Sequence, residues 1–150
     1  MTKRSQGNTH DTKLQSDIAE SAVLTELLRK GFSVLRPVGD RLPYDLAVDC
    51  QGRLLRIQIK SAWYDSRKRL YTVDVRRTKT NRRRMLRARY DATDFDVAVL
   101  YVPERSSFYV MPVDIFTSYR SGISLIEGRI SQRRPRSSDY LNRWDLLCPA

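Results

Sequence analysis

The chain has 150 residues, which is enough for a single domain with a hydrophobic core. Its 28 lysines and arginines oppose 17 aspartates and glutamates, so the net charge is +11. A positive excess of this size favours an anionic polymer as partner, with nucleic acid first and an acidic membrane surface or a purely structural role as alternatives. The apolar runs are short and the N-terminus is polar, so we expect no membrane span and no secretion signal.

The two cysteines are too few for a disulfide scaffold and show no zinc-binding spacing, which fits a reducing, cytoplasmic environment. His10 is the only histidine and lies in the polar start of the chain. Catalysis by a Ser-His or Cys-His pair is therefore not expected. No glycine-rich phosphate loop occurs, so we expect no nucleotide cofactor.

The first predicted element is a helix over residues 12–30. Thr12-Lys13-Leu14-Gln15 has the pattern of a capping box, and Gly31 suits the position just beyond a helix C-terminus. Apolar residues occur on nearly every side of the second half of this segment. We therefore expect that half of the helix to be buried all round.

Strands and two further helices are predicted downstream. Alternating or continuous apolar residues between turn signals predict strands at residues 32–35, 44–49, 54–62, 70–75, 95–102 and 108–111. A short helix is expected at residues 113–119, a loop at 120–138 and a final helix at 138–147, which would carry Trp144, Leu146 and Leu147 onto the core. A helix, several strands and a helix indicate an α/β or α+β layer fold.

A predicted hairpin brings an acid, an amide and a lysine together. Its turn is Cys50-Gln51-Gly52-Arg53, in which the glycine supplies the unusual backbone angle. Side chains alternate between the faces of a strand, so Gln58 and Lys60 share a face, and the hairpin sets Asp45 alongside. Carboxylate and carbonyl oxygens can hold a divalent cation, and an ammonium can orient water or stabilise a phosphate, which suits phosphodiester hydrolysis. The alternatives are a turn-capping aspartate and a solvated sheet face.

Glu20 is a further candidate for this site. Apolar residues follow it on the same side of the predicted helix, so its carboxylate should be partly buried. A partly buried carboxylate needs a cation or a donor, and either a metal ion or Lys60 would serve. The alternative is a surface ion pair with a basic neighbour such as Lys13 or Arg29.

These features together resemble the PD-(D/E)XK nucleases, and most of all the small group I intron-encoded homing endonucleases of cyanobacteria, whose motif ends in Gln-x-Lys. The segments that carry the resemblance are Glu20, Gly31-Phe32-Ser33-Val34, Pro37, Pro43-Tyr44-Asp45-Leu46 and Arg56-Ile57-Gln58-Ile59-Lys60. The resemblance implies one endonuclease domain over residues 1–150, with a mixed central sheet flanked by helices as in restriction endonucleases. It also implies double-strand cleavage of DNA at one long site by a dimer or tetramer. A Holliday junction resolvase, a restriction-type nuclease and a non-catalytic nucleic-acid-binding protein are the alternatives.

By the same resemblance, Glu20, Asp45, Gln58 and Lys60 take the catalytic roles. Asp45 would be the main metal ligand, and Glu20, Gln58 and the Ile59 carbonyl would supply further oxygens. Gln58 stands where most relatives have an acid, which removes one negative charge and leaves the number of metal ions open. Lys60 would orient the attacking water and offset charge on the phosphate. Mg²⁺ is the expected ion, because it prefers hard oxygen ligands and retains waters.

A basic insert at about residues 63–90 is expected to contact the DNA. A two-stranded ribbon or loop of this kind can enter the major groove. Most of its side chains would contact phosphates, while Asn81 and one or two arginines would read base edges. The predicted DNA-binding residues are Arg67, Lys68, Arg69, Lys79, Asn81, Arg82, Arg83 and Arg84. The alternative is a solvated loop that attracts DNA without specificity.

Overall fold

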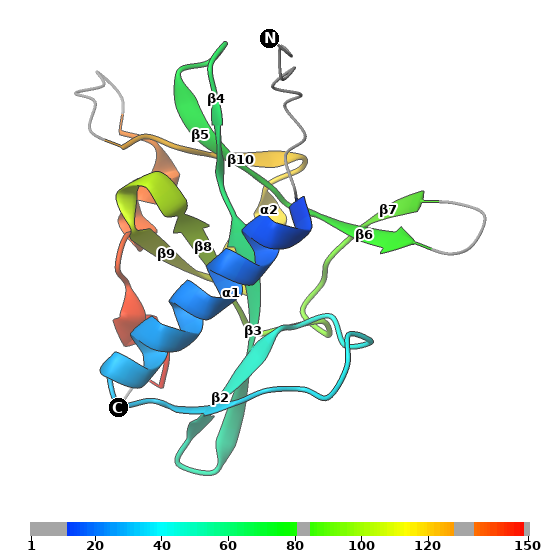
Figure 1. Cartoon of the computed structure of the whole chain (residues 1–150), viewed down its shortest axis with the longest axis vertical. Coiled ribbons are helices and arrows are strands. Elements are labelled where there is room, and N and C mark those ends of the chain that lie inside the picture. Colours follow the sequence, from blue (N-terminus) through cyan, green and yellow to red (C-terminus); the bar gives the residue numbers. More distant parts are fainter. Residues whose placement is uncertain (1–11, 81–84, 128–133, 149–150) are drawn as a thin grey trace, which may run out of the picture.

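The computed structural model describes residues 12–80, 85–127 and 134–148 (Figure 1). Its helices are α1 (Thr12–Arg29) and α2 (Val113–Ser118), with 3₁₀ turns η1 (Pro103–Arg105), η2 (Arg136–Tyr140) and η3 (Trp144–Leu146). The strands are β1 (Ser33–Leu35), β2 (Leu46–Cys50), β3 (Arg53–Ser61), β4 (Trp63–Asp65), β5 (Leu70–Asp74), β6 (Arg76–Thr80), β7 (Met85–Arg89), β8 (Val97–Val102), β9 (Ser107–Pro112) and β10 (Gly122–Leu125). None of the helices in these ranges is long and apolar enough to cross a membrane.

The central sheet has five strands in the order β1-β2-β3-β8-β9. β3 and β8 are parallel, and the other neighbours are antiparallel, so the sheet is mixed, as predicted. Every residue of β8 is buried. Val97, Val99 and Tyr101 face the core under α1, and the alternate residues of β8 face a second core on the other side of the sheet. A strand covered on both faces needs this continuous apolar sequence.

Helix α1 lies across one face of the sheet (Figure 1). It buries a single stripe of Ala19, Val23 and Leu27, while Leu28 remains 57% exposed. The expectation that the second half of the helix is buried all round was therefore wrong, because α1 has the sheet on one side only. The helix ends as predicted: Gly31 has φ +83°, and the Phe32 amide donates to the Leu27 carbonyl in a Schellman-type cap.

Two smaller sheets extend the central one. β10, β5 and β4 form a three-stranded antiparallel sheet, and β6 pairs with β7 in an antiparallel ribbon that projects from the body of the molecule (Figure 1). The basic insert of the sequence is thus divided between two structures, with β4 and β5 in the three-stranded sheet and residues 76–80 and 85–89 in the ribbon.

The C-terminal third differs from the sequence-based prediction. The expected loop at residues 120–138 contains β10, whose Ile123 pairs with Val73 of β5. The expected final helix is replaced by η2 and η3, between which Asn142 has φ +53°. This left-handed residue ends any continuous helix, because a helix needs negative φ throughout. Trp144 and Leu147 nevertheless reach the core, as predicted.

The two cysteines form a disulfide and are not the reduced pair that the sequence analysis expected. Cys50, at the end of β2, forms a disulfide with Cys148, 98 residues later in the chain. The C-terminal segment brings Cys148 to this position by packing Trp144 and Leu147 against the core beneath α1. A single crosslink is not a disulfide scaffold, but it fastens the chain end to the hairpin of β2 and β3.

Candidate active site

One open cleft of about 780 Å³ contains all of the predicted catalytic residues. Its wall is built from the first half of α1, the residue directly before β2, the end of β3, the start of β4, the last residue of β5, the first residue of β6 and η1. The cleft residues are Glu20, Asp45, Gln58, Ile59 and Lys60, together with Thr12, Lys13, Gln15, Ser16, Ser61, Ala62, Trp63, Asp74, Arg76 and Glu104. Segments far apart in the sequence therefore meet at one place, as the hairpin and helix predictions require.

Asp45 is fixed at the mouth of the hairpin by two backbone contacts. Its amide donates to the Ile57 carbonyl at 2.8 Å, and its Oδ2 accepts from the Ile59 amide at 2.8 Å. Burial raises the pKa of Asp45 from 3.8 to about 6; the Ile59 amide opposes the rise, the Glu20 charge adds to it and the Lys60 charge opposes it. The surrounding positive charge therefore does not offset the cost of burying the ionised carboxylate, and a bound cation would stabilise that ionised form.

Gln58 is 9% exposed, so the solvated-face alternative does not apply to it. Its Nε2 donates to the carbonyl oxygen of Ile59 at 3.1 Å. Asp45 directly precedes β2, and its amide bonds to Ile57, the same residue of β3 that pairs with Leu46. The Gln58 amide and the Asp45 carboxylate line the same cleft.

Lys60 extends from β3 toward the ribbon. Its Nζ donates to the Arg76 carbonyl at 3.2 Å and lies 5.0 Å from the centroid of the Tyr90 ring. Burial lowers the pKa of Lys60, and the charges of Asp74 and Asp45 oppose that effect. A mostly desolvated ammonium beside carboxylates provides a strong local field for an anionic substrate.

Glu20 lies at the edge of the cleft, with its side chain 33% exposed. The predicted partial burial is thus present. Its Oε1 pairs with Arg36 Nη2 at 3.4 Å, in the segment after β1. The ion-pair alternative therefore also holds, but with a partner that the sequence analysis did not consider, because only the fold brings β1 alongside α1.

The structure adds residues to the site that sequence reasoning missed. Asp74 lines the cleft, and its Oδ1 accepts from the Arg76 amide at 2.9 Å and from Arg76 Nε at 3.3 Å. Trp63 forms part of the wall and is 39% exposed. The available signal was the position of Asp74 at the end of a predicted strand, directly before the basic run.

The donor set fits a hard divalent cation. No three of the His, Cys, Asp and Glu side chains in the described ranges gather as a metal site, so a ligand set here would have to include the Gln58 amide or the Ile59 carbonyl. Asp45, Glu20, Gln58 and Ile59 all line the cleft and offer only oxygens besides the amide nitrogen. Oxygen ligands and an undercompensated carboxylate suit Mg²⁺ or a similar ion.

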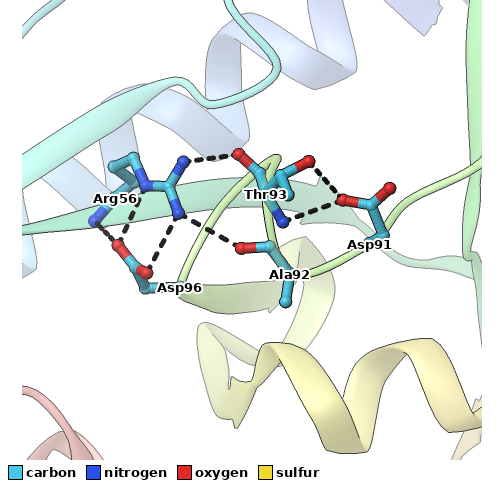
Figure 2. A network of polar contacts seen from close by, with 5 residues as sticks. All are labelled: Arg56, Asp91, Ala92, Thr93 and Asp96. Carbon is cyan, nitrogen blue, oxygen red and sulfur yellow. Dashed lines mark hydrogen bonds and ion pairs between the residues drawn. The ribbon is translucent and has the colours of Figure 1, made fainter.

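A polar network holds β3 against the loop that precedes β8 (Figure 2). The Arg56 guanidinium donates to both carboxylate oxygens of Asp96 at 3.1 Å and to the Thr93 carbonyl at 2.6 Å, and the Arg56 amide donates to Asp96 Oδ2 at 2.8 Å. Burial raises the pKa of Asp96, but these bonds outweigh it and hold the pKa below its ordinary value. The network fastens the chain before β8 to β3, next to Ile57 and Val97, where the parallel pairing of the two strands begins.

Four of the eight predicted DNA-binding residues lie in the described part of the chain. Arg67, Lys68 and Arg69 lie at the turn between β4 and β5, where the Arg67 and Lys68 amides donate to Asp65. Lys79 belongs to β6 of the ribbon. The remaining four, Asn81, Arg82, Arg83 and Arg84, lie outside the described residues. Of the two forms expected for this stretch, a two-stranded ribbon or a loop, β6 and β7 form the ribbon, while its contact with DNA stays a prediction.

Comparisons with known proteins agree with this geometry. The model of the PD-(D/E)XK endonuclease family matches residues 10–147. A solved structure, "The structure of a bacterial homing endonuclease: I-Ssp6803I", is similar with a TM-score of 0.85 and 49% identity over 92% of this chain and 93% of that chain. No curated protein matches. The chain belongs to the PD-(D/E)XK endonuclease family, which confirms the resemblance and the fold class inferred from the sequence.

Proposed function

We propose that this chain is a site-specific homing endonuclease that makes a double-strand break in DNA by metal-dependent hydrolysis of phosphodiester bonds. The observation that carries the proposal is the meeting of Glu20, Asp45, Gln58 and Lys60 in one cleft of a PD-(D/E)XK endonuclease. The similarity to a homing endonuclease over nearly the whole chain supports the more specific activity.

Mg²⁺ is the cofactor that the donor set favours. Asp45 would be its principal ligand, with Glu20, Gln58 and the Ile59 carbonyl as the other protein oxygens. When bound, the ion would acidify a water and neutralise charge on the scissile phosphate. The Arg36 guanidinium competes for Glu20 at 3.4 Å, so metal binding and this ion pair should be coupled.

The protein groups supply orientation and charge. The Lys60 ammonium would stabilise negative charge as it develops on the phosphate, and its desolvation strengthens that interaction. The Ile59 amide holds the Asp45 carboxylate at a fixed position. The Gln58 amide, held by the Ile59 carbonyl, replaces a charged group with a neutral dipole. This substitution limits the negative charge that faces an incoming phosphate.

DNA would approach the cleft between the β4–β5 turn and the β6–β7 ribbon. The net charge of +11 supports attraction to DNA, and the ribbon supports groove contact. One cleft per chain cuts one strand, so a double-strand break requires a dimer or tetramer. The similar solved structure is that of a bacterial homing endonuclease, and on this ground we place the activity in the cytoplasm, although the Cys50–Cys148 disulfide differs from the reduced pair expected there.

The proposal is tested by cleavage of a large, varied DNA library in Mg²⁺. Wild type should make a few discrete cuts, which are lost in Asp45→Ala and Lys60→Ala. Lys30→Ala is the matched control, because Lys30 pairs with Glu26 at the opposite end of α1 and should leave the cuts intact. Undiminished cutting by Asp45→Ala would refute the assigned site. General degradation of the library would refute site-specific cleavage. If the protein cut branched junctions and no linear DNA, the proposed function would change from homing to junction resolution.

A further inference from the structure

Lys60 rests against the two ends of the β6–β7 ribbon. Its hydrogen-bond acceptor is the carbonyl of Arg76, the first residue of β6, and its aromatic neighbour is Tyr90, which directly follows β7. Arg76 and Arg89 are paired across the ribbon. The pairing of the two strands therefore brings both contacts to the same ammonium.

Tyr90 has little freedom to move. It is 9% exposed, and its ring meets Phe95 edge-on at 5.3 Å between centroids and Phe116 at 6.1 Å. Phe95 and Phe116 are fully buried and meet each other at 5.6 Å. A ring held between two packed aromatic side chains cannot follow a moving ammonium, so it defines where the ammonium rests.

The chemistry of the two contacts leaves Lys60 able to act. An ammonium has three N–H donors, of which the Arg76 carbonyl accepts one. The face of Tyr90 attracts the cation through its quadrupole without accepting a directed hydrogen bond. The Arg76 carbonyl and the Tyr90 ring, which together we call the seat of Lys60, therefore hold this side chain in place. They leave N–H donors of the Lys60 ammonium for a group that enters the cleft.

We propose that Tyr90 is a positioning residue for DNA cleavage, which seats the Lys60 ammonium together with the Arg76 carbonyl. Arg76 and Tyr90 stand at the two ends of the ribbon and also contact Lys60, so a displacement of the ribbon would displace the Lys60 ammonium. This inference rests on the proposed function, in which Lys60 acts on the scissile phosphate. It predicts that a change of Tyr90 slows the step after DNA binding and leaves binding itself intact.

The test combines single-turnover cleavage in Mg²⁺ with DNA binding in EDTA. Tyr90→Leu should lower the cleavage rate of bound DNA by about 10- to 30-fold, the rate equivalent of a lost desolvated cation–π contact, with an unchanged Kd. Tyr90→Phe keeps the ring and should recover most of the lost rate. Tyr101→Leu removes another buried tyrosine, which stacks on Phe108 away from the cleft, and controls for general loss of packing. A wild-type rate in Tyr90→Leu, or equal losses in both Tyr90 variants, would overturn the proposal.

A second measurement needs neither DNA nor activity. The ε-methylene protons of Lys60, assigned by their loss in Lys60→Arg, should be shifted upfield by the Tyr90 ring current in the NMR spectrum of the wild-type protein. The shift should persist in Tyr90→Phe and disappear in Tyr90→Leu. Its absence in wild type would refute the seat directly. A chain that keeps the shift but cuts no DNA would instead refute the proposed function.

Discussion

Replacing Asp45 by asparagine should stabilise the metal-free protein while abolishing cleavage. The carboxylate is partly buried, receives one backbone hydrogen bond and lies near the charge of Glu20. Asparagine keeps the shape and the acceptor for the Ile59 amide but carries no charge. The substitution therefore removes the cost of burying an ion and leaves the packing unchanged.

The pKa of Asp45 sets the magnitude. A rise from 3.8 to about 6 corresponds to about 3 kcal/mol at about 1.4 kcal/mol per unit. Because the folded-state pKa is the higher one, the stabilising contribution of Asp45 is fully present below pH 3.8 and is lost as the pH rises through 6. Contact with solvent in the cleft reduces the effect, so we expect a gain of about 1 to 3 kcal/mol for Asp45→Asn above pH 7.

The assay is urea unfolding in EDTA over a range of pH. The stability of Asp45→Asn should match that of wild type near pH 4 and exceed it increasingly toward neutral pH. Asp49→Asn, at an exposed carboxylate of β2, should show no such gain. Added Mg²⁺ should then stabilise wild type and not Asp45→Asn. Equal stability of the two proteins at neutral pH without metal would refute the reasoning.

Three further predictions follow from neighbouring contacts. Asp96→Ala should lower the free energy of unfolding by about 2 kcal/mol, because it removes both carboxylate contacts of the Arg56 guanidinium and the acceptor of the Arg56 amide; a loss within urea-titration error would contradict it. Gln58→Ala should slow cleavage by about 10²-fold, whereas Gln51→Ala in the exposed turn should not; equal rates would make Gln58 a bystander. The fluorescence of exposed Trp63 should change on DNA binding and that of buried Trp144 should not, and the same titration should show the affinity falling about 10³- to 10⁵-fold between 50 and 200 mM salt. An unchanged Trp63 signal would show that bound DNA does not contact this residue.

Features that depend on neighbours along the chain were predictable from the sequence. Alternation within β3 gave Gln58 and Lys60 a common face, and a turn with Gly52 at φ +89° set Asp45 beside them. The apolar run of residues 97–102 predicted a strand, and β8 is a strand that is buried on both faces. In each case the period of the side chains or the steric freedom of glycine is a local property, so no knowledge of the rest of the fold was required.

Only the tertiary structure decided which partners these residues meet. The pairing of Glu20 with Arg36 depends on how β1 passes α1, and the contacts of Lys60 with Arg76 and Tyr90 depend on where the ribbon leaves the second sheet. In the C-terminal segment, left-handed Asn142 separates two 3₁₀ turns, Trp144 and Leu147 pack in the core, and Cys148 is bonded to Cys50. Burial and long-range pairing outweigh local propensity at such places, since each involves residues that the chain alone keeps far apart.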